Sequence, residues 1–190
     1  MQIPAETVTA CFPPSFTAGN IVLRPLTLGD AVRLGSIGVD VNRRIPADKL
    51  FSVAFVISGE AVSSPLHAHN GEAVSSPLQL KAYRRFLRRA RVGLQELSSA
   101  IEKALNAAFE TWIPPMEQKG ATRQLTPSGL GWPLEYAEWL CAEYGWSFDR
   151  ALETPVATVF ALVAAARKRN DGKHGGPDYV ERVVVKNMTH

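Results

Sequence analysis

The chain has 190 residues, of which 46% are hydrophobic and 21% are charged, fractions that are typical of globular proteins and exclude a wholly disordered chain. The net charge is +3, but residues 81–103 alone hold seven basic and two acidic residues, so the basic excess is local. No apolar run approaches the roughly 18 to 20 residues of a membrane span. Neither a secretory signal nor a cysteine framework is predicted, so we expect a cytoplasmic protein without membrane segments.

The first part of the chain is predicted to be an arm that leads into short helices. Residues 1–20 are expected to be irregular, except for a short strand at 8–12 that is followed by another at 21–24. Thr27 and Asp30 have the spacing of a capping box, which predicts a helix starting after Thr27. The apolar run at 50–57 fits a buried strand or a buried helix, and its position between helices favours the helix.

A duplicated segment precedes the clearest pattern in the sequence. Gly59–Leu66 recurs as Gly71–Leu78, and two copies of a Ser/Pro/Gly-rich unit (59–78) indicate a surface loop because a solenoid needs about three repeats. Over 80–112, apolar residues then recur at alternating spacings of three and four, which predicts one long amphipathic helix. Gly93 is a weak point of this helix, and Pro114-Pro115 ends it.

The rest of the chain is predicted to form a second helical region. The domain organisation expected from the whole sequence is an arm (1–20), a helical region (21–115), a polar linker (116–131), a C-terminal helical unit (132–172) and an extended tail (173–190). Within the C-terminal unit, Gly145 should end a helix that begins near Trp132, and Ser147 should cap a short helix after it. The expected fold class is therefore mainly α, a small helical domain with one long amphipathic helix and a short N-terminal β-hairpin.

No group of residues has the arrangement of a catalytic or metal site. His67 and His69 are the only paired histidines, and a metal site needs three or four ligands. The Gly-rich segment 172–178 lacks the Gly-Lys-Ser/Thr order of a phosphate-binding loop. Cys141 falls on an apolar helix face and is expected in the core. The sequence therefore predicts no enzyme activity, no cofactor and no metal.

A basic segment is one candidate binding site. On the predicted long helix, Arg84, Arg88 and Arg91 share one stripe, and Lys81, Arg85 and Arg89 share the adjoining one. Such a face could contact phosphates, but it lacks interleaved exposed aromatic residues for base stacking. Nucleic acid is therefore the alternative partner, and a solvated or protein-docking face is favoured.

Two stretches resemble a known family. Residues 23–31 (LRPLTLGDA) resemble an opening phrase of small proteins from tailed-phage morphogenesis modules, and the region 132–168, with its YGWS turn, is similar to the ending of phage tail assembly chaperones. The resemblance implies a non-enzymatic helical protein of the bacterial host cytoplasm. Such a protein binds a long helical partner, the tape measure protein, and an amphipathic helix of this kind is also able to self-associate. The candidate contact or core residues are then Leu94, Leu97, Ile101, Trp132, Trp139 and Trp146.

Overall fold

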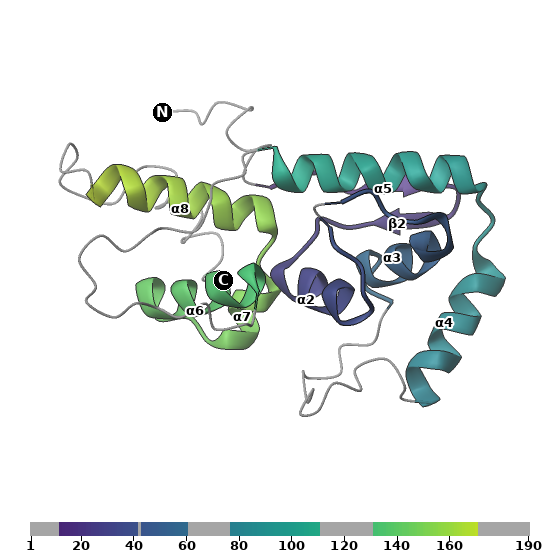
Figure 1. Cartoon of the computed structure of the whole chain (residues 1–190), viewed down its shortest axis with the longest axis horizontal. Coiled ribbons are helices and arrows are strands. Elements are labelled where there is room, and N and C mark those ends of the chain that lie inside the picture. Colours follow the sequence, from purple (N-terminus) through teal and green to yellow (C-terminus); the bar gives the residue numbers. More distant parts are fainter. Residues whose placement is uncertain (1–11, 42, 61–76, 111–130, 171–190) are drawn as a thin grey trace. The chain divides into compact units, whose positions relative to one another are not determined.

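The computed structural model of the chain describes residues 12–41, 43–60, 77–110 and 131–170, and it is mainly α, as expected (Figure 1). The described residues contain seven α-helices and one two-stranded β-hairpin. The chain divides into two compact units. The N-terminal unit is Pro14–Asn106, and the C-terminal unit is Met1–Pro13 together with Ala107–His190.

One strand of the hairpin in the N-terminal unit lies where the sequence predicted it, at 21–24, and the other lies later in the chain than the strand predicted at 8–12. Strand β1 (Phe16–Ala18) pairs antiparallel with β2 (Ile21–Leu23), and Ala18 lies opposite Ile21. The arm is therefore not irregular as far as residue 20, and residues 8–11 of the strand predicted at 8–12 lie outside the described residues. The two strands are joined by Gly19 and Asn20, a Gly-Asn pair that suits a two-residue hairpin turn and that the sequence analysis missed.

Helix α2 (Leu28–Ser36) begins at the predicted capping box. The Asp30 backbone N–H donates to Thr27 Oγ1 at 3.1 Å, and the Thr27 backbone N–H donates to Asp30 Oδ2 at 3.2 Å. The other carboxylate oxygen of Asp30 accepts from Arg24 at 2.8 Å and from Arg33 at 3.3 Å. Asp30 is fully buried, so one carboxylate joins the helix start to Arg24, the residue that follows β2.

The apolar run at 50–57 is a helix, which confirms the choice of helix over strand. A 3-10 turn, η1 (Ala47–Lys49), leads into α3 (Leu50–Ile57). Most of the residues of α3 are buried, and the helix contacts η1, α2, α4 and β2. A helix that is covered on nearly every side has no polar face, so hydrophobic periodicity alone could not distinguish it from a buried strand.

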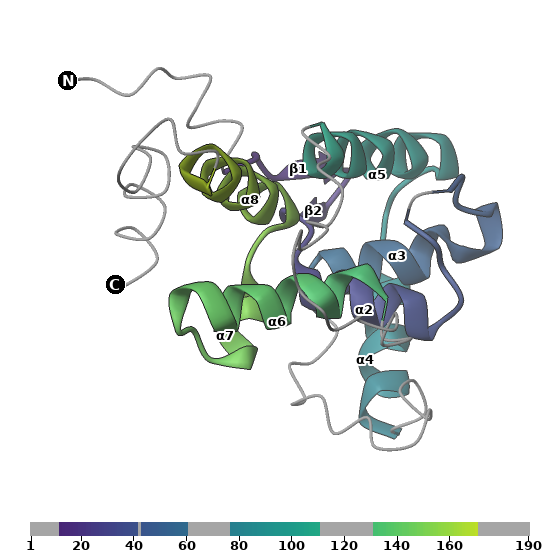
Figure 2. The same ribbon diagram turned by 60° about the vertical axis from the view of Figure 1, so that its left-hand side comes forward.

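The single helix predicted over 80–112 is wrong, because the structure has two helices there. Helix α4 (Pro77–Arg89) ends before Ala90, and α5 (Leu94–Phe109) starts after Gly93; Figures 1 and 2 show α4 turned away from the line of α5. Asn20, from the hairpin turn, donates through Nδ2 to the Arg89 carbonyl at 2.8 Å and accepts at Oδ1 from the Arg91 backbone N–H at 3.0 Å. These bonds satisfy backbone groups that a continuous helix would pair internally, and they stabilise the break.

Replacing Gly19 by alanine should destabilise the N-terminal unit more than the same change at Gly38. Both glycines have positive φ, +56° and +73°, but an added Cβ would lie 2.5 Å from the Arg91 carbonyl oxygen at Gly19 and would meet nothing within 4 Å at Gly38. We expect Gly38→Ala to lower the free energy of unfolding by about 1–2 kcal/mol, from the backbone alone, and Gly19→Ala to lower it further. Urea denaturation followed by circular dichroism measures both, and equal losses would contradict the close approach.

The C-terminal unit contains three complete helices, and a cluster of aromatic rings surrounds one residue of the last of them. Helix α6 (Trp132–Tyr144) ends at Gly145, which has φ +66°, and α7 (Phe148–Glu153) is capped by Ser147, both as predicted. The third helix is α8 (Val156–Asn170), and Figures 1 and 2 show it running beside α6. Phe160 of α8 is fully buried, and its ring centroid lies 5.6 Å from that of Tyr136.

Most of the predicted connecting segments lie outside the described residues. These are nearly all of the duplicated loop (61–76 of 59–78), the linker as far as residue 130, and the tail from 173. Of the loop, the structure describes Gly59 and Glu60 at one end, and Pro77 and Leu78 at the other, where they already form the start of α4.

Candidate partner-binding surface

The three candidate contact residues from the predicted long helix have different environments. Leu97 and Ile101 of α5 are fully buried and belong to the core of the N-terminal unit. Leu94, the first residue of α5, is 54% exposed. Of these three residues, only Leu94 is therefore available to a partner.

The three candidate tryptophans all belong to the C-terminal unit. Trp146 is buried, and the guanidinium of Arg150 lies 4.8 Å from the centre of its ring, so it belongs to the core. Trp132 and Trp139 are partly exposed. Trp132 packs edge-to-face against Phe109 of α5, with ring centroids 5.7 Å apart. Trp139 also packs edge-to-face, against Tyr144, with ring centroids 5.7 Å apart. Part of each of these two indoles is therefore covered by an aromatic residue of the same chain.

The ionisable groups of this aromatic cluster do not suggest acid–base chemistry. Burial raises the pKa of Tyr136 to about 12, and the nearby positive charge of Arg167 opposes this shift. The Tyr136 hydroxyl is therefore protonated at neutral pH. Cys141, which was expected in the core, is only half-buried on α6.

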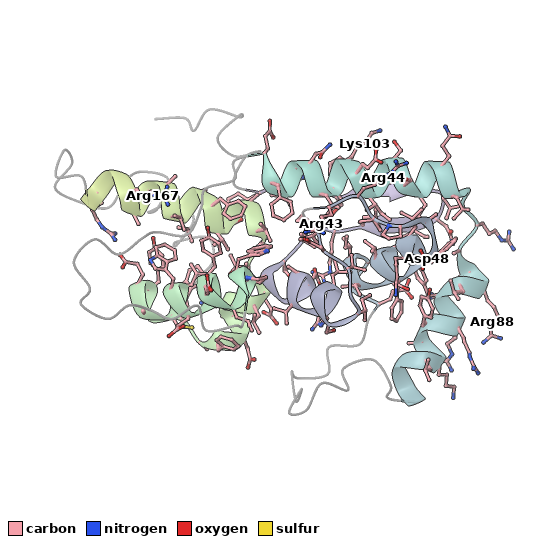
Figure 3. The ribbon with its side chains drawn as sticks, in the orientation of Figure 1. Arg43, Arg44, Asp48, Arg88, Lys103 and Arg167 are labelled. Atoms are coloured by element: carbon pink, nitrogen blue, oxygen red, sulfur yellow. The ribbon has the colours of Figure 1, made fainter. Side chains whose placement is uncertain are left out.

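The predicted basic stripes are altered by the end of α4. Arg84, Arg85, Arg88 and Arg89 lie on α4 and are exposed, and Figure 3 shows Arg88 projecting outward from the helix. Arg91 does not extend the Arg84–Arg88 stripe, because the helix ends at Arg89 and the Arg91 backbone is bound to Asn20. Arg89 pairs with Glu60. The other basic side chains of this segment form no ion pair with a described carboxylate.

Two exposed leucines on α4 were not among the predicted contact residues. Leu80 is 46% and Leu87 is 40% exposed, although the heptad pattern placed both on the inward stripe. The side of α4 that packs inward carries Tyr83 and Phe86, whose rings lie 5.2 and 5.4 Å from that of Phe55 on α3. In the sequence, Phe86 lies beside the heptad stripe. An inward face centred on Phe86, and not on Leu80 and Leu87, would have predicted the side of α4 that packs against α3.

Other kinds of site have no support among the residues that the structure describes. No three histidine, cysteine or acidic side chains gather there as a metal site would require, and His67 and His69 lie outside these residues. Every helix within the described ranges is too short or too polar to cross a membrane. No protein-family model, no curated protein and no solved structure matches this chain, so its function has to be argued from the exposed side chains themselves.

Proposed function

We propose that this chain is a non-enzymatic binding protein that holds a helical segment of another protein, in the manner of a phage tail assembly chaperone. The observation that supports the proposal is a pair of exposed leucines seven residues apart on one helix, Leu80 and Leu87 of α4, which are 46% and 40% exposed. A third exposed leucine, Leu94, begins the next helix, α5, and is 54% exposed. Single exposed leucines are common on protein surfaces, but leucine at heptad spacing is the pattern by which helices recognise one another. Burying these side chains against a partner helix would supply the binding free energy.

The resemblance to tail assembly chaperones supports the same class of function. It implies a bacterial host cytoplasm as the location and a tape measure-like protein as the partner. Residues 23–31, which carry part of that resemblance, hold the buried Leu23, Leu26 and Leu28 and the capping box, so their role is to form the fold. The contact residues that we now propose are Leu80, Leu87 and Leu94, in place of the buried Leu97, Ile101 and Trp146.

Nucleic acid is the second candidate partner, and the exposed cations of α4 are the observation that favours it. Arg84, Arg85 and Arg88 could contact phosphates and would make binding depend steeply on salt. Tyr83, the residue before Arg84, stacks on Phe86 and shares a hydrogen bond with Ser52, so it is not available to stack on a base. A nucleic acid would therefore contact the arginines of α4 alone, whereas a protein partner could contact both the arginines and the exposed leucines.

A pull-down of the tagged chain from a lysate of its host tests the proposal. We expect a long, helix-rich protein to be recovered and to survive nuclease treatment. The triple variant L80S/L87S/L94S should reduce its recovery at least about tenfold, because three partly buried leucines together contribute more than the 1.4 kcal/mol that a factor of ten requires.

The variant V22S provides the control, because Val22 is 55% exposed on β2 and is not one of these three leucines. It should leave recovery unchanged. A nucleic-acid-dependent mixture of proteins would overturn the proposal in favour of the second candidate. Equal recovery by the triple variant would show that the leucines do not bind the partner.

A further inference from the structure

The exposed side of α4 combines apolar and basic residues in a regular way. We propose that this outer face of α4, defined by Leu80, Lys81, Arg84, Leu87 and Arg88, docks an acidic amphipathic helix of another protein. This inference rests on the proposed function, and it adds the place of docking and the chemistry of the partner.

The spacing of these residues forms two adjoining rows on one side of the helix. At about 100° per residue, Leu80, Arg84 and Leu87 form one row, and Lys81 and Arg88 form the next. All five side chains are exposed. A helix laid along these rows would meet leucine and arginine alternately, which suits a partner with an apolar stripe that is flanked by carboxylates.

The outer face of α4 is not needed to hold the helix in the fold. The contacts with α3 are made by Tyr83 and Phe86, which surround Phe55, and by the hydroxyl of Tyr83, which lies 3.2 Å from Ser52 Oγ. Phe86 is almost fully buried. The leucines and arginines of the outer face can therefore be changed without removing the contacts that anchor α4.

The charge of this face indicates an acidic partner. Residues 81–91 hold six basic residues and no acidic one. Elsewhere in the same unit, arginines meet carboxylates of the chain, as Arg24 and Arg33 do at Asp30. Lys81, Arg84 and Arg88 form no such pair with a described carboxylate. Carboxylates on a docked helix would complement them and would also favour rapid association.

Three other occupants fit the face less well. A second copy of the chain docked through its own α4 would bring like charges together. A nucleic acid would leave Leu80 and Leu87 without an apolar partner. A lipid surface calls for a wide apolar helix face, but Phe86 is buried against α3, and Leu80 and Leu87 are the large apolar side chains that are exposed on the part of α4 whose burial the structure describes. The acidic helix is the occupant that uses both the leucines and the cations.

Titration of the full chain with a synthetic helix tests this assignment. The probe is a labelled peptide of about three heptads, with leucine in the apolar stripe and glutamate beside it, and its binding is followed by fluorescence anisotropy. We expect the glutamate peptide to bind at least about tenfold more tightly than the same peptide with glutamine in place of glutamate. The variant R84E/R88E should remove this preference, R84K/R88K should retain it, and L80S/L87S should weaken both peptides.

A matched charge reversal elsewhere in the unit separates docking on α4 from general attraction. Arg43 and Arg44 are exposed and lie outside α4 (Figure 3), so R43E/R44E changes the net charge by the same amount as R84E/R88E. The control variant R43E/R44E should still bind the glutamate peptide more tightly than the glutamine peptide, by most of the factor that the unchanged chain shows. Circular dichroism verifies that each variant is folded, and R84Q/R88Q replaces R84E/R88E if the latter is not.

Several results would overturn the assignment. Equal binding of the two peptides, binding of neither, or an equal effect of R43E/R44E would each do so. Tighter binding of duplex DNA or of anionic phospholipid vesicles, lost in R84E/R88E, would assign the face to that ligand. If the pull-down recovers a protein partner through the leucines and R84E/R88E recovers it equally well, the proposed function survives and the acidic partner is excluded. Loss of the leucine dependence itself would instead reject the proposed function.

Discussion

Replacing Phe160 by alanine should lower the free energy of unfolding of the C-terminal unit by about 3–5 kcal/mol, the range for removing a buried aromatic side chain. Phe160 is fully buried in α8. Its ring centroid lies 5.6 Å from that of Tyr136, 6.1 Å from that of Phe109 and 6.4 Å from that of Trp132. The substitution removes this central ring, and the rings around it cannot close the resulting cavity without losing their own contacts.

Tryptophan fluorescence during urea denaturation measures this effect selectively, because all four tryptophans of the chain belong to the C-terminal unit. The control is Phe148→Ala, which removes the same side chain from a position that is 45% exposed. Phe148→Ala should lower the free energy of unfolding by less than about 1 kcal/mol. Similar losses for the two variants would mean that the ring cluster around Phe160 is not the core of this unit.

Replacing Asp30 by alanine should lower the free energy of unfolding of the N-terminal unit by about 2–4 kcal/mol. The change removes one half of the capping box and leaves the Thr27 backbone N–H and the guanidinium of Arg24 without their carboxylate. The side chains of Arg24 and Arg33 are 34% and 30% exposed, so water compensates part of the loss. Faster hydrogen exchange of the α2 amides, and a lower urea midpoint by circular dichroism, should report it.

Asp40→Ala is the matched control for this change. Asp40 also pairs with an arginine three residues away, Arg43, but both side chains are largely exposed. Exposed pairs of this kind contribute about 0–1 kcal/mol, so the control should have little effect. If Asp30→Ala were as mild as Asp40→Ala, the buried carboxylate would not be what joins the start of α2 to Arg24.

The parts of the fold that depend on neighbouring residues could be predicted from the sequence. The capping box needs only Thr27 and Asp30, the end of α6 needs only Gly145, and the start of α7 needs only Ser147. The break between α4 and α5 could not be predicted in the same way. Gly93 marked a weak point, but the bonds that stabilise the break come from Asn20, 71 residues before Arg91.

The binding surface was harder to predict than the fold, because the heptad pattern shows which residues are apolar and not which of them will be covered. Leu87 and Ile101, 14 residues apart, occupy equivalent places in that pattern, yet Ile101 is buried and Leu87 is exposed. The difference arises because Phe55 of α3 packs against the side of α4 that carries Phe86. Similarly, the spacing of the tryptophans by seven could not show that Trp146 is buried beneath Arg150.

The bonds from the hairpin turn also determine when the N-terminal unit can be completed during synthesis. Gly19 and Asn20 meet Glu96, Arg91 and Arg89, which follow them by 69–77 residues. A hairpin of two three-residue strands is not stable alone, so on the ribosome it has to wait for these later residues to emerge. Until then, the side chains of Ile21 and Leu23 lack the contacts that bury them in the folded unit. The last helix of the N-terminal unit to be synthesised, α5, therefore completes the structure that the hairpin begins.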